Sequence, residues 1–403
     1  MTDARPVVAA AKRTVFGKNR GSLSGIRPDD LLALSLKELA ESIPALDLGR
    51  IDDVVMGDAN GAGEDNRNVA RMGSLLAGFP VSVPGVTLNR LCGSGGEAIV
   101  QASRAVFTGD MDIVIAGGVE SMSRAPFILP KSETAFSRNA EIYDTTIGWR
   151  FVNSAMKAAY GVDSMPETAD HVALDYHISR ADQDAFALRS QQRWSAAHAA
   201  AKFADEITPV MIPQRRGDPV TVDTDEHPRP DTKPERLAAL EGVNGNGSTV
   251  TAGNASGVND GAAALLLASA NGLAAHGLTP MARIVAIAAA GVPPRVMGIG
   301  PVPATQKALG MAGLCIDDMD VIEINEAFAA QGLACLRELG VADDAAHVNP
   351  NGGAIAIGHP LGMSGARLVL TAAYELRRRG GRYALCTMCV GVGQGVAMII
   401  EAA

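Results

Sequence analysis

The chain of 403 residues is long enough for two or three domains with ample hydrophobic cores. Its formal net charge of -9, without any block rich in lysine and arginine, argues against nucleic acid as a partner. A hydrophobic content of 47% together with 44 glycines is typical of closely packed α/β layers.

Targeting and membrane signals are not expected in this sequence. No apolar run approaches the ~18 residues that a membrane span needs. The segment from Met1 to Arg5 does not resemble the start of a secretory signal. Five cysteines, an odd number, do not indicate a disulfide framework, which favours a reducing, cytoplasmic location.

Apolar runs alternate with helical segments in the first part of the chain. The predicted strands cover residues 6–17, 51–57, 86–91 and 112–118. The predicted helices cover residues 28–40 and 97–107. This alternation indicates right-handed crossovers and mostly parallel strands with helices on both faces.

A comparable order recurs late in the chain, where Ile-Asp-Asp again precedes an apolar run. The predicted strands here cover residues 282–290, 321–324 and 383–388, and the predicted helices cover 303–309 and 364–379. We therefore expect an α/β fold of two repeated halves, each with a mixed, mostly parallel sheet covered by helices.

Residues 122–250 have a different composition, richer in polar groups and proline, which indicates an inserted loop domain. It contains a predicted helix over 180–203, with Ser179 as its N-cap. The predicted organisation is a first half of residues 1–121 with 251–276, the insertion, and a second half of residues 277–403.

Cys92 lies where a predicted strand turns into a predicted helix. The positive end of the helix dipole would lower the pKa of its thiol and favour a nucleophilic thiolate. The alternative is a buried cysteine beside a glycine hinge, since cysteine is among the most buried residue types. This segment alone leaves both interpretations open.

Two other segments combine reactive groups with glycine-rich surroundings. His359, between Gly358 and Pro360, is either a satisfied core residue or the proton acceptor of a cysteine. Cys386 and Cys389 have the C-x-x-C spacing, but no second pair of ligands accompanies them, so we expect no metal. Strand alternation places them on opposite faces, with Cys389 in the site.

Asn325 and Glu326 follow a predicted strand. Asn325 could hold a water or a carbonyl, and Glu326 could orient a histidine. The alternative is that Asn325 caps a helix beginning at Ala327. Both uses of Asn325 draw on the same side-chain amide, so the alternatives stay open.

Six motifs, taken together, resemble those of the thiolase family in order and spacing. They are NRLCGSGGEA, GGVESMS, TAGNASGVNDGAA, NEAFAAQ, NPNGGAIAIGHPLGMSGAR and CTMCVGVGQG. Ketosynthases share the fold and the nucleophile, but the second cysteine motif favours a thiolase. The resemblance implies acyl transfer between a 3-oxoacyl-CoA and coenzyme A, or the reverse condensation. It also implies acyl-CoA partners, no permanently bound cofactor, and homodimers or homotetramers.

The resemblance implies roles for individual residues. Cys92 would form the acyl-enzyme, His359 would accept its proton, and Cys389 would be the second acid/base. One oxyanion hole would use His359 and a water held by Asn325. The other would use the backbone N–H groups of Cys92 and Gly391, where a side chain would intrude on the thioester.

Coenzyme A contacts are implied in the same way. Ser256 matches the pantetheine contact, Arg229 falls where a basic residue contacts the nucleotide, and the small residues from Ala252 suit a narrow tunnel. Met165 lies in Ser-Met-Pro, where short-chain biosynthetic thiolases carry His-Met-Gly. Their Arg-Pro-Ala-Phe run is replaced here by residues 241–244, so the packing around coenzyme A and the choice of substrate should differ.

Four further stretches are most similar to the 3-oxoadipyl-CoA thiolases of aromatic-acid breakdown, which yield succinyl-CoA and acetyl-CoA. They are GEDNRNVARM, DTTIGWRFVN, GVDSMPETAD and SRADQDAFALRSQQR. A terminal carboxylate would need a cation or an amide, and Arg150 and Lys157 are candidates by location. The alternatives are a general acetyl-CoA acetyltransferase acting on acetoacetyl-CoA and a thiolase-like protein that only binds acyl-CoA.

Overall fold

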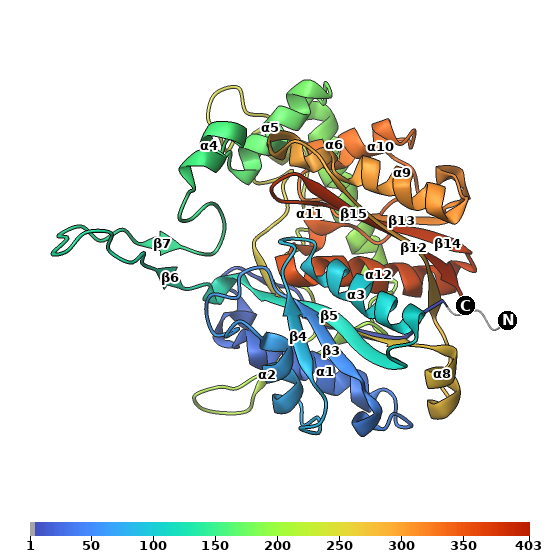
Figure 1. The fold of residues 1–403 in the computed structure, drawn as a ribbon. Coiled ribbons are helices and arrows are strands. Elements are labelled where there is room, and N and C mark those ends of the chain that lie inside the picture. The colour runs from blue at the N-terminus through green and yellow to red at the C-terminus, as the bar shows by residue number, and fades with distance from the viewer. Residues whose placement is uncertain (1–4) are drawn as a thin grey trace.

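The computed structural model describes residues 5–403. The first four residues, on which the expected absence of a secretory signal partly rests, lie outside the described residues. One mixed sheet of eleven strands crosses the molecule (Figure 1). Its main path, in spatial order, is β13 (Val321–Ile324), β14 (Tyr383–Val390), β15 (Gln394–Ala402), β12 (Ala282–Gly291), β1 (Val7–Thr14), β11 (Asn259–Ala268), β5 (Ile113–Ser121), β3 (Asp53–Gly57) and β4 (Gly85–Leu88).

The strand pairing repeats between the two halves. In the first half β3 pairs parallel with β5, β5 pairs antiparallel with β11, and β11 pairs antiparallel with β1. The second half repeats this spatial order and these directions with β13, β14, β15 and β12. Strands β1 and β12 join the halves, with Val7 opposite Arg283. The predicted α/β fold with two repeated halves is confirmed.

Helices cover both faces of the sheet. At the centre, α3 (Ser94–Thr108) packs against α12 (Leu361–Arg379), and α12 contacts both β5 and β14 (Figure 1). On the outer faces, α1 (Pro28–Glu41) packs with α2 (Val69–Leu76), and α9 (Pro301–Ala312) packs on β12 and β15. Alternate residues of β5 serve two cores: Val114 faces the central helices, and Ile115 faces α1.

Several boundaries differ from the sequence prediction. Helix α3 begins at Ser94 rather than 97, and α12 begins at Leu361 rather than 364. Strand β4 ends at Leu88, because residues 90–94 form a hydrogen-bonded turn before α3. Helix α6 (Arg180–Ala199) ends earlier than 203 but begins as predicted, with the Ser179 hydroxyl accepting a 3.1 Å hydrogen bond from the N–H of Asp182.

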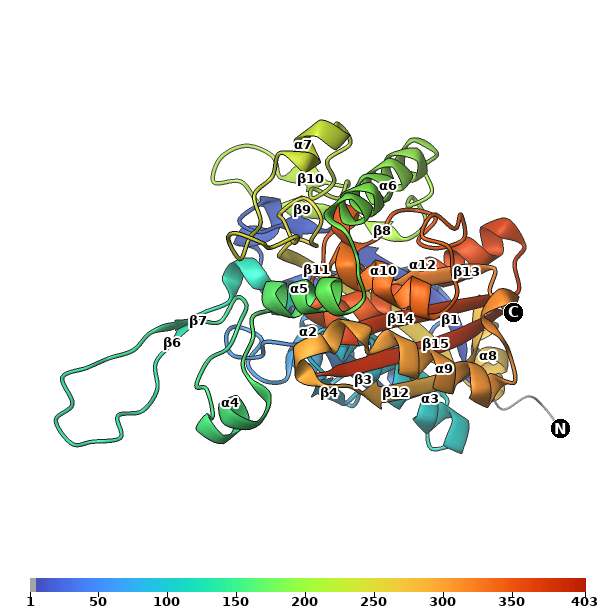
Figure 2. The same cartoon turned by 90° about the horizontal axis from the view of Figure 1, so that it is seen from above.

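The inserted region carries mainly helices and an arm. Its helices are α4 (Ser154–Tyr160), α5 (Met165–Asp175), α6 and α7 (Pro234–Ala238). The arm, residues 127–144, is closed at its base by β6 (Phe127–Ile128) and β7 (Tyr143–Asp144) and extends away from the body (Figures 1 and 2). The other strands and α-helices are β2 (Gly17–Lys18), β8 (Ile207–Thr208), β9 (Val210–Ile212), β10 (Val220–Val222), α8 (Ala270–His276), α10 (Ala329–Glu338) and α11 (Ala354–Ile357).

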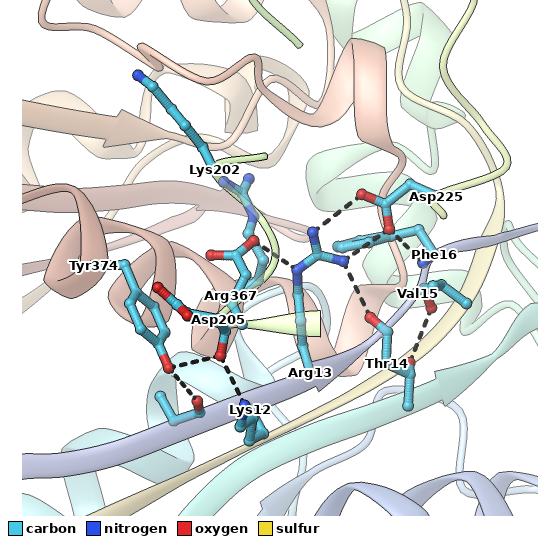
Figure 3. A network of polar contacts seen from close by, with 12 residues as sticks. Lys12, Arg13, Thr14, Val15, Phe16, Lys202, Asp205, Asp225, Arg367 and Tyr374 are labelled. Carbon is cyan, nitrogen blue, oxygen red and sulfur yellow. Dashed lines mark hydrogen bonds and ion pairs between the residues drawn. The ribbon is translucent and has the colours of Figure 1, made fainter. Parts of the chain in front are cut away.

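A buried ion network fastens the inserted region to β1 (Figure 3). The Arg13 guanidinium donates to Glu206 at 2.9 Å and to the two carboxylate oxygens of Asp225 at 2.8 and 3.0 Å. Arg13 is fully buried. Over residues 5–403, no helix is both long enough and apolar enough to cross a membrane.

Candidate active site

Cys92 lies in the turn between β4 and α3, and the turn is held by Ser94. The Ser94 hydroxyl donates to the carbonyl of Leu91 at 2.6 Å and accepts from the N–H of Arg90 at 2.9 Å. Leu91 adopts a left-handed conformation, with φ of 49°. Such backbone conformations are costly outside glycine and often mark functional turns. The turn thereby presents the Cys92 side chain to a cavity of about 200 Å³.

The environment of Cys92 overturns the expectation of a thiolate favoured by the helix end. Helix α3 begins after its N-cap, Gly93, so Cys92 lies outside the first helical turn. Burial raises the pKa of the Cys92 thiol to about 11, while a hydrogen bond from the backbone N–H of Gly391 acts in the opposite direction. Because the thiol form dominates at neutral pH, a nucleophilic Cys92 requires a base.

A second tight turn, between β14 and β15, meets the Cys92 turn from the other half of the chain. Gly391 lies in this turn, and the next residue, Val392, has a φ of 61° despite its branched side chain. A Cβ atom placed on Gly391 would lie 3.0 Å from Leu91 Cδ1, and one on Gly93 would lie 2.8 Å from Val390 Cγ2. The two turns are therefore in close contact, and Gly391 directs its N–H at Cys92.

The hydrogen bonds of His359 determine its tautomer. The Ser364 hydroxyl donates to the carbonyl of Pro360 at 2.7 Å, so it accepts the 2.6 Å hydrogen bond from His359 Nδ1–H. His359 Nε2 is then unprotonated and lies 3.3 Å from the amide nitrogen of Asn325. Burial, together with the nearby charge of Arg367, lowers the pKa of His359 to about 3. The arrangement provides a neutral imidazole that can accept a proton at Nε2.

The structure decides between the interpretations of Asn325 and Glu326. Helix α10 begins at Ala329 with Phe328 as its N-cap, so Asn325 does not cap it. The Asn325 Oδ1 atom is buried and accepts no hydrogen bond from residues 5–403. Glu326 does not orient His359, because its carboxylate accepts from Ser190 at 2.7 Å and from Asn349 at 2.7 Å.

Cys389 is buried beside the same site. Burial raises the pKa of Cys389 well above its ordinary value, and the neighbouring Cys92 raises it further. Cys389 packs in a small apolar cluster with Phe328 and Met165, whereas Cys386 belongs to the central core. The side chains of Cys386 and Cys389 thus pack in different clusters, as strand alternation predicts. All cysteines are free, and no group of metal-ligating side chains occurs within residues 5–403.

The cavity around Cys92, which we call the Cys92 cavity, is lined from both halves and from the inserted region. Gly391, Met165, Glu120 and Arg150 share its wall with Cys92. Lys157, the other predicted candidate for a carboxylate contact, lies exposed on α4 and is not part of this wall.

The residues predicted to contact coenzyme A do not lie in one cavity. Arg229 and Ala252 line a separate cavity of about 510 Å³, which we call the Arg229 cavity. Met165 lines the Cys92 cavity instead. Ser256 lines neither cavity, and its N–H donates to the carbonyl of Ala327 at 2.9 Å, beside Asn325 and Glu326.

Sequence reasoning missed several residues of the site. Ser364, which fixes the tautomer of His359, carries no local signal beyond its place within the histidine motif. Glu120, in the motif GGVESMS, accepts hydrogen bonds from the N–H groups of Ala59 and Gly362 at 3.0 and 2.8 Å. His227 lines the Arg229 cavity, and no spacing pattern points to it.

The chain matches the model of the N-terminal domain of thiolases over residues 6–271 and that of the C-terminal domain over residues 278–402. The chain therefore belongs to the thiolase family, and it is an acyltransferase of that class.

Particular relatives are similar over almost the whole length. A beta-ketoadipyl-CoA thiolase of Pseudomonas aeruginosa is 65% identical over 394 residues, which are 98% of each chain. A 3-oxoadipyl-CoA/3-oxo-5,6-dehydrosuberyl-CoA thiolase of Escherichia coli is 62% identical over 389 residues, 96% of this chain and 97% of that protein. The crystal structure of human mitochondrial 3-ketoacyl-CoA thiolase in complex with CoA superposes with a TM-score of 0.91 at 40% identity, covering 99% of this chain and 98% of that one.

Proposed function

We propose that this thiolase cleaves 3-oxoadipyl-CoA with coenzyme A, giving succinyl-CoA and acetyl-CoA. The observation that carries the proposal is the end-to-end similarity to relatives named for this substrate. The contacts around Cys92 support the chemistry, because the Gly391 N–H, the Cys389 thiol and a short acyl cavity converge on one sulfur.

In the first half-reaction, Cys92 Sγ attacks the 3-oxo carbonyl while its proton passes to His359 Nε2. The tautomer fixed by Ser364 leaves Nε2 without a hydrogen, so Nε2 can accept this proton. Once protonated, Nε2–H is a donor toward an oxyanion, together with a water on the otherwise unpartnered Oδ1 of Asn325. The bond between the second and third carbons then breaks, and Cys389 protonates the departing carbon to release acetyl-CoA.

In the second half-reaction, the thiol of coenzyme A attacks the succinyl-Cys92 thioester and gives its proton to the Cys389 thiolate. The oxyanion that forms accepts from the backbone N–H groups of Cys92 and Gly391. Collapse releases succinyl-CoA, and the Cys92 thiolate recovers its proton from His359. Each acid and base returns to its starting state, so the cycle needs no permanently bound cofactor and no metal.

We assign coenzyme A to the surface between the Cys92 cavity and the Arg229 cavity. The Arg229 cavity is lined by two cations, Arg229 and Arg236, which suit the phosphates of a nucleotide, and by the small residues Ala252 and Gly253, which suit a narrow pantetheine arm. Ser256 and Met165 are assigned to the pantetheine. We propose the same domain organisation that the sequence predicts. Residues 1–121 with 251–276 form the first half, residues 122–250 the insertion, and residues 277–403 the second half.

We also propose that the protein is a cytoplasmic homodimer or homotetramer. The arm supports assembly, because its apolar side chains at Phe127, Leu129, Phe136 and Ile142 are exposed by 61% or more. Light scattering after gel filtration tests this, and a monomer at micromolar concentration would refute it.

The substrate is tested by comparing thiolysis rates. We expect kcat/KM for 3-oxoadipyl-CoA to exceed that for acetoacetyl-CoA, and the reverse order would favour the general acetyltransferase. Exposure to acetyl-CoA followed by mass spectrometry should show an acetyl group on Cys92. Its absence, with no thiolysis of either substrate, would favour a protein that only binds acyl-CoA.

A further inference from the structure

We propose that Arg150 binds the terminal carboxylate of the acyl group that Cys92 receives, and so selects acyl chains that end in a carboxylate. The inference rests on the proposed function, because it assigns the part of the protein that distinguishes succinyl from uncharged acyl groups.

Arg150 is placed at the reaction site by the loop that follows the arm. Its side chain is half-buried, whereas those of its neighbours Trp149 and Phe151 are exposed. It lines the Cys92 cavity, whose volume of about 200 Å³ suits a short acyl chain rather than a long one. A succinyl group on Cys92 has only two methylenes between its thioester carbonyl and its carboxylate, so its charge must lie within this cavity.

The charge of Arg150 is not neutralised by the protein. Among the residues that the structure describes, Arg150 is the only lysine or arginine that lines the Cys92 cavity. Within residues 5–403 it forms no ion pair, and its one hydrogen bond runs from Nη2 to the neutral Oδ1 of Asn60 at 3.2 Å. A guanidinium carries five N–H donors in a planar fork that matches a carboxylate, so most of its donors can reach a ligand.

Asn60 holds the guanidinium in a fixed place. Its amide nitrogen donates to the carbonyl and hydroxyl oxygens of Thr145 at 3.2 and 3.1 Å, and its backbone N–H donates to Glu120 at 3.2 Å. A preorganised amide that leaves the charge of the arginine intact is the arrangement expected for binding an external anion.

Two carboxyl groups also line the cavity, and neither pairs with Arg150. Glu120 accepts hydrogen bonds from the N–H groups of Ala59, Asn60 and Gly362. Burial raises the pKa of Glu120 to about 7, which reduces its negative charge at neutral pH. The Asp163 carboxylate lies 3.6 Å from His171 Nε2. A cation whose protein neighbours leave it unpaired is a site for a carboxylate brought by the substrate.

The experiment compares two substrates of equal chain length, 3-oxoadipyl-CoA and 3-oxohexanoyl-CoA, which carries a methyl group in place of the carboxylate. We expect Arg150→Gln to lower kcat/KM for 3-oxoadipyl-CoA by about 10- to 100-fold, the range for losing a hydrogen bond to a charged group. The value for 3-oxohexanoyl-CoA should stay within about threefold of the unchanged enzyme. Arg150→Lys keeps the positive charge but lacks the planar guanidinium, so it should lower kcat/KM for 3-oxoadipyl-CoA less than Arg150→Gln does.

Lys157→Gln is the matched control, because it removes a cation from the same inserted region at an exposed position outside the cavity. It should leave the ratio of the two kcat/KM values unchanged. If Arg150→Gln lowers kcat/KM for both substrates equally, Arg150 only supports the loop. The inference is then wrong, while the proposed function stands. If the unchanged enzyme does not cleave 3-oxoadipyl-CoA, the proposed function itself fails.

Discussion

At the scale of single residues, the chemistry proposed for Cys92 depends on groups that come from the other half of the chain. Burial raises the pKa of its thiol to about 11, so a helix end alone would leave it inactive. Ser364 holds His359 in the tautomer that accepts a proton, and Gly391 supplies an N–H to the sulfur. In the proposed mechanism, the reactivity of Cys92 therefore depends on how the site is assembled.

The two cysteines should be separable by mutation. We expect Cys389→Ala to form the acetyl-enzyme at Cys92 but to lose exchange of the α-proton of acetyl-CoA, because the substitution removes only the proposed second acid/base. Mass spectrometry measures the first step and proton NMR in deuterated water measures the second. Full exchange in this variant would show that another group moves the proton.

The raised pKa of Cys92 predicts the pH dependence of its alkylation. A thiol whose pKa is raised to about 11 ionises progressively as pH rises. The thiolate fraction, and with it the rate of reaction with iodoacetamide, should therefore increase roughly tenfold per pH unit from pH 7 to 9. Peptide mapping distinguishes Cys92 from the other cysteines. A rate that reaches a plateau below pH 8 would instead indicate a thiolate paired with a protonated histidine.

At the scale of elements, the site depends on close contacts of helices α3 and α12 with the sheet. A Cβ on Gly95 would lie 2.5 Å from the carbonyl oxygen of Gly362, and one on Gly118 would lie 2.0 Å from that oxygen. A Cβ on Gly57 would lie 2.2 Å from the backbone nitrogen of Gly95. These glycines let the backbones touch, and the contacts set the position of the start of α12, just after His359.

Gly118→Ala should therefore destabilise the fold by roughly 3 kcal/mol, since backbone atoms on both sides must move. Gly310→Ala is the control. Gly310 lies on the exposed side of α9 with open space around it, so alanine should add about 0.5–1 kcal/mol of stability. Denaturant unfolding measures both changes. Equal effects of the two substitutions would contradict the close packing.

At the scale of the whole molecule, the inserted region is attached through buried charges as well as apolar contacts. Arg13 of β1 binds Glu206 and Asp225, and Asp225 also accepts a 2.8 Å hydrogen bond from the N–H of Phe16 (Figure 3). The Tyr374 hydroxyl of α12 lies within hydrogen-bond distance of two carbonyl oxygens, one on β1 at 2.9 Å and one on the insertion at 3.0 Å. Both halves thus hold the region that carries Arg150 and Met165.

Arg13→Met should destabilise the protein by about 3–5 kcal/mol, because it leaves two buried carboxylates without a cation. Arg382→Met is the matched control. Arg382 pairs with Glu401 while 69% of its side chain is exposed, so its loss should cost less than about 1 kcal/mol. Thermal and urea unfolding measure both variants. A small effect of Arg13→Met would mean that Glu206 and Asp225 are protonated or solvated once the arginine is gone.

Much of this architecture can be predicted from local sequence. The strands and helices of both halves, the N-cap at Ser179 and the repeated Ile-Asp-Asp phrase all depend on residues close together in the chain. The boundaries around Cys92 could not be placed in this way, because the turn over residues 90–94 is fixed by Ser94 and by contact with the turn at Gly391.

The sequence by itself determined the family, the repeat and the types of reactive group, since motifs and periodicity are written in neighbouring residues. Only the tertiary structure decided that the pKa of Cys92 is raised rather than lowered, that Ser364 rather than Glu326 orients His359, and that Arg150 rather than Lys157 faces the cavity. Burial, tautomer and cavity walls depend on which distant segments pack together, and that packing arises when the two halves and the insertion meet.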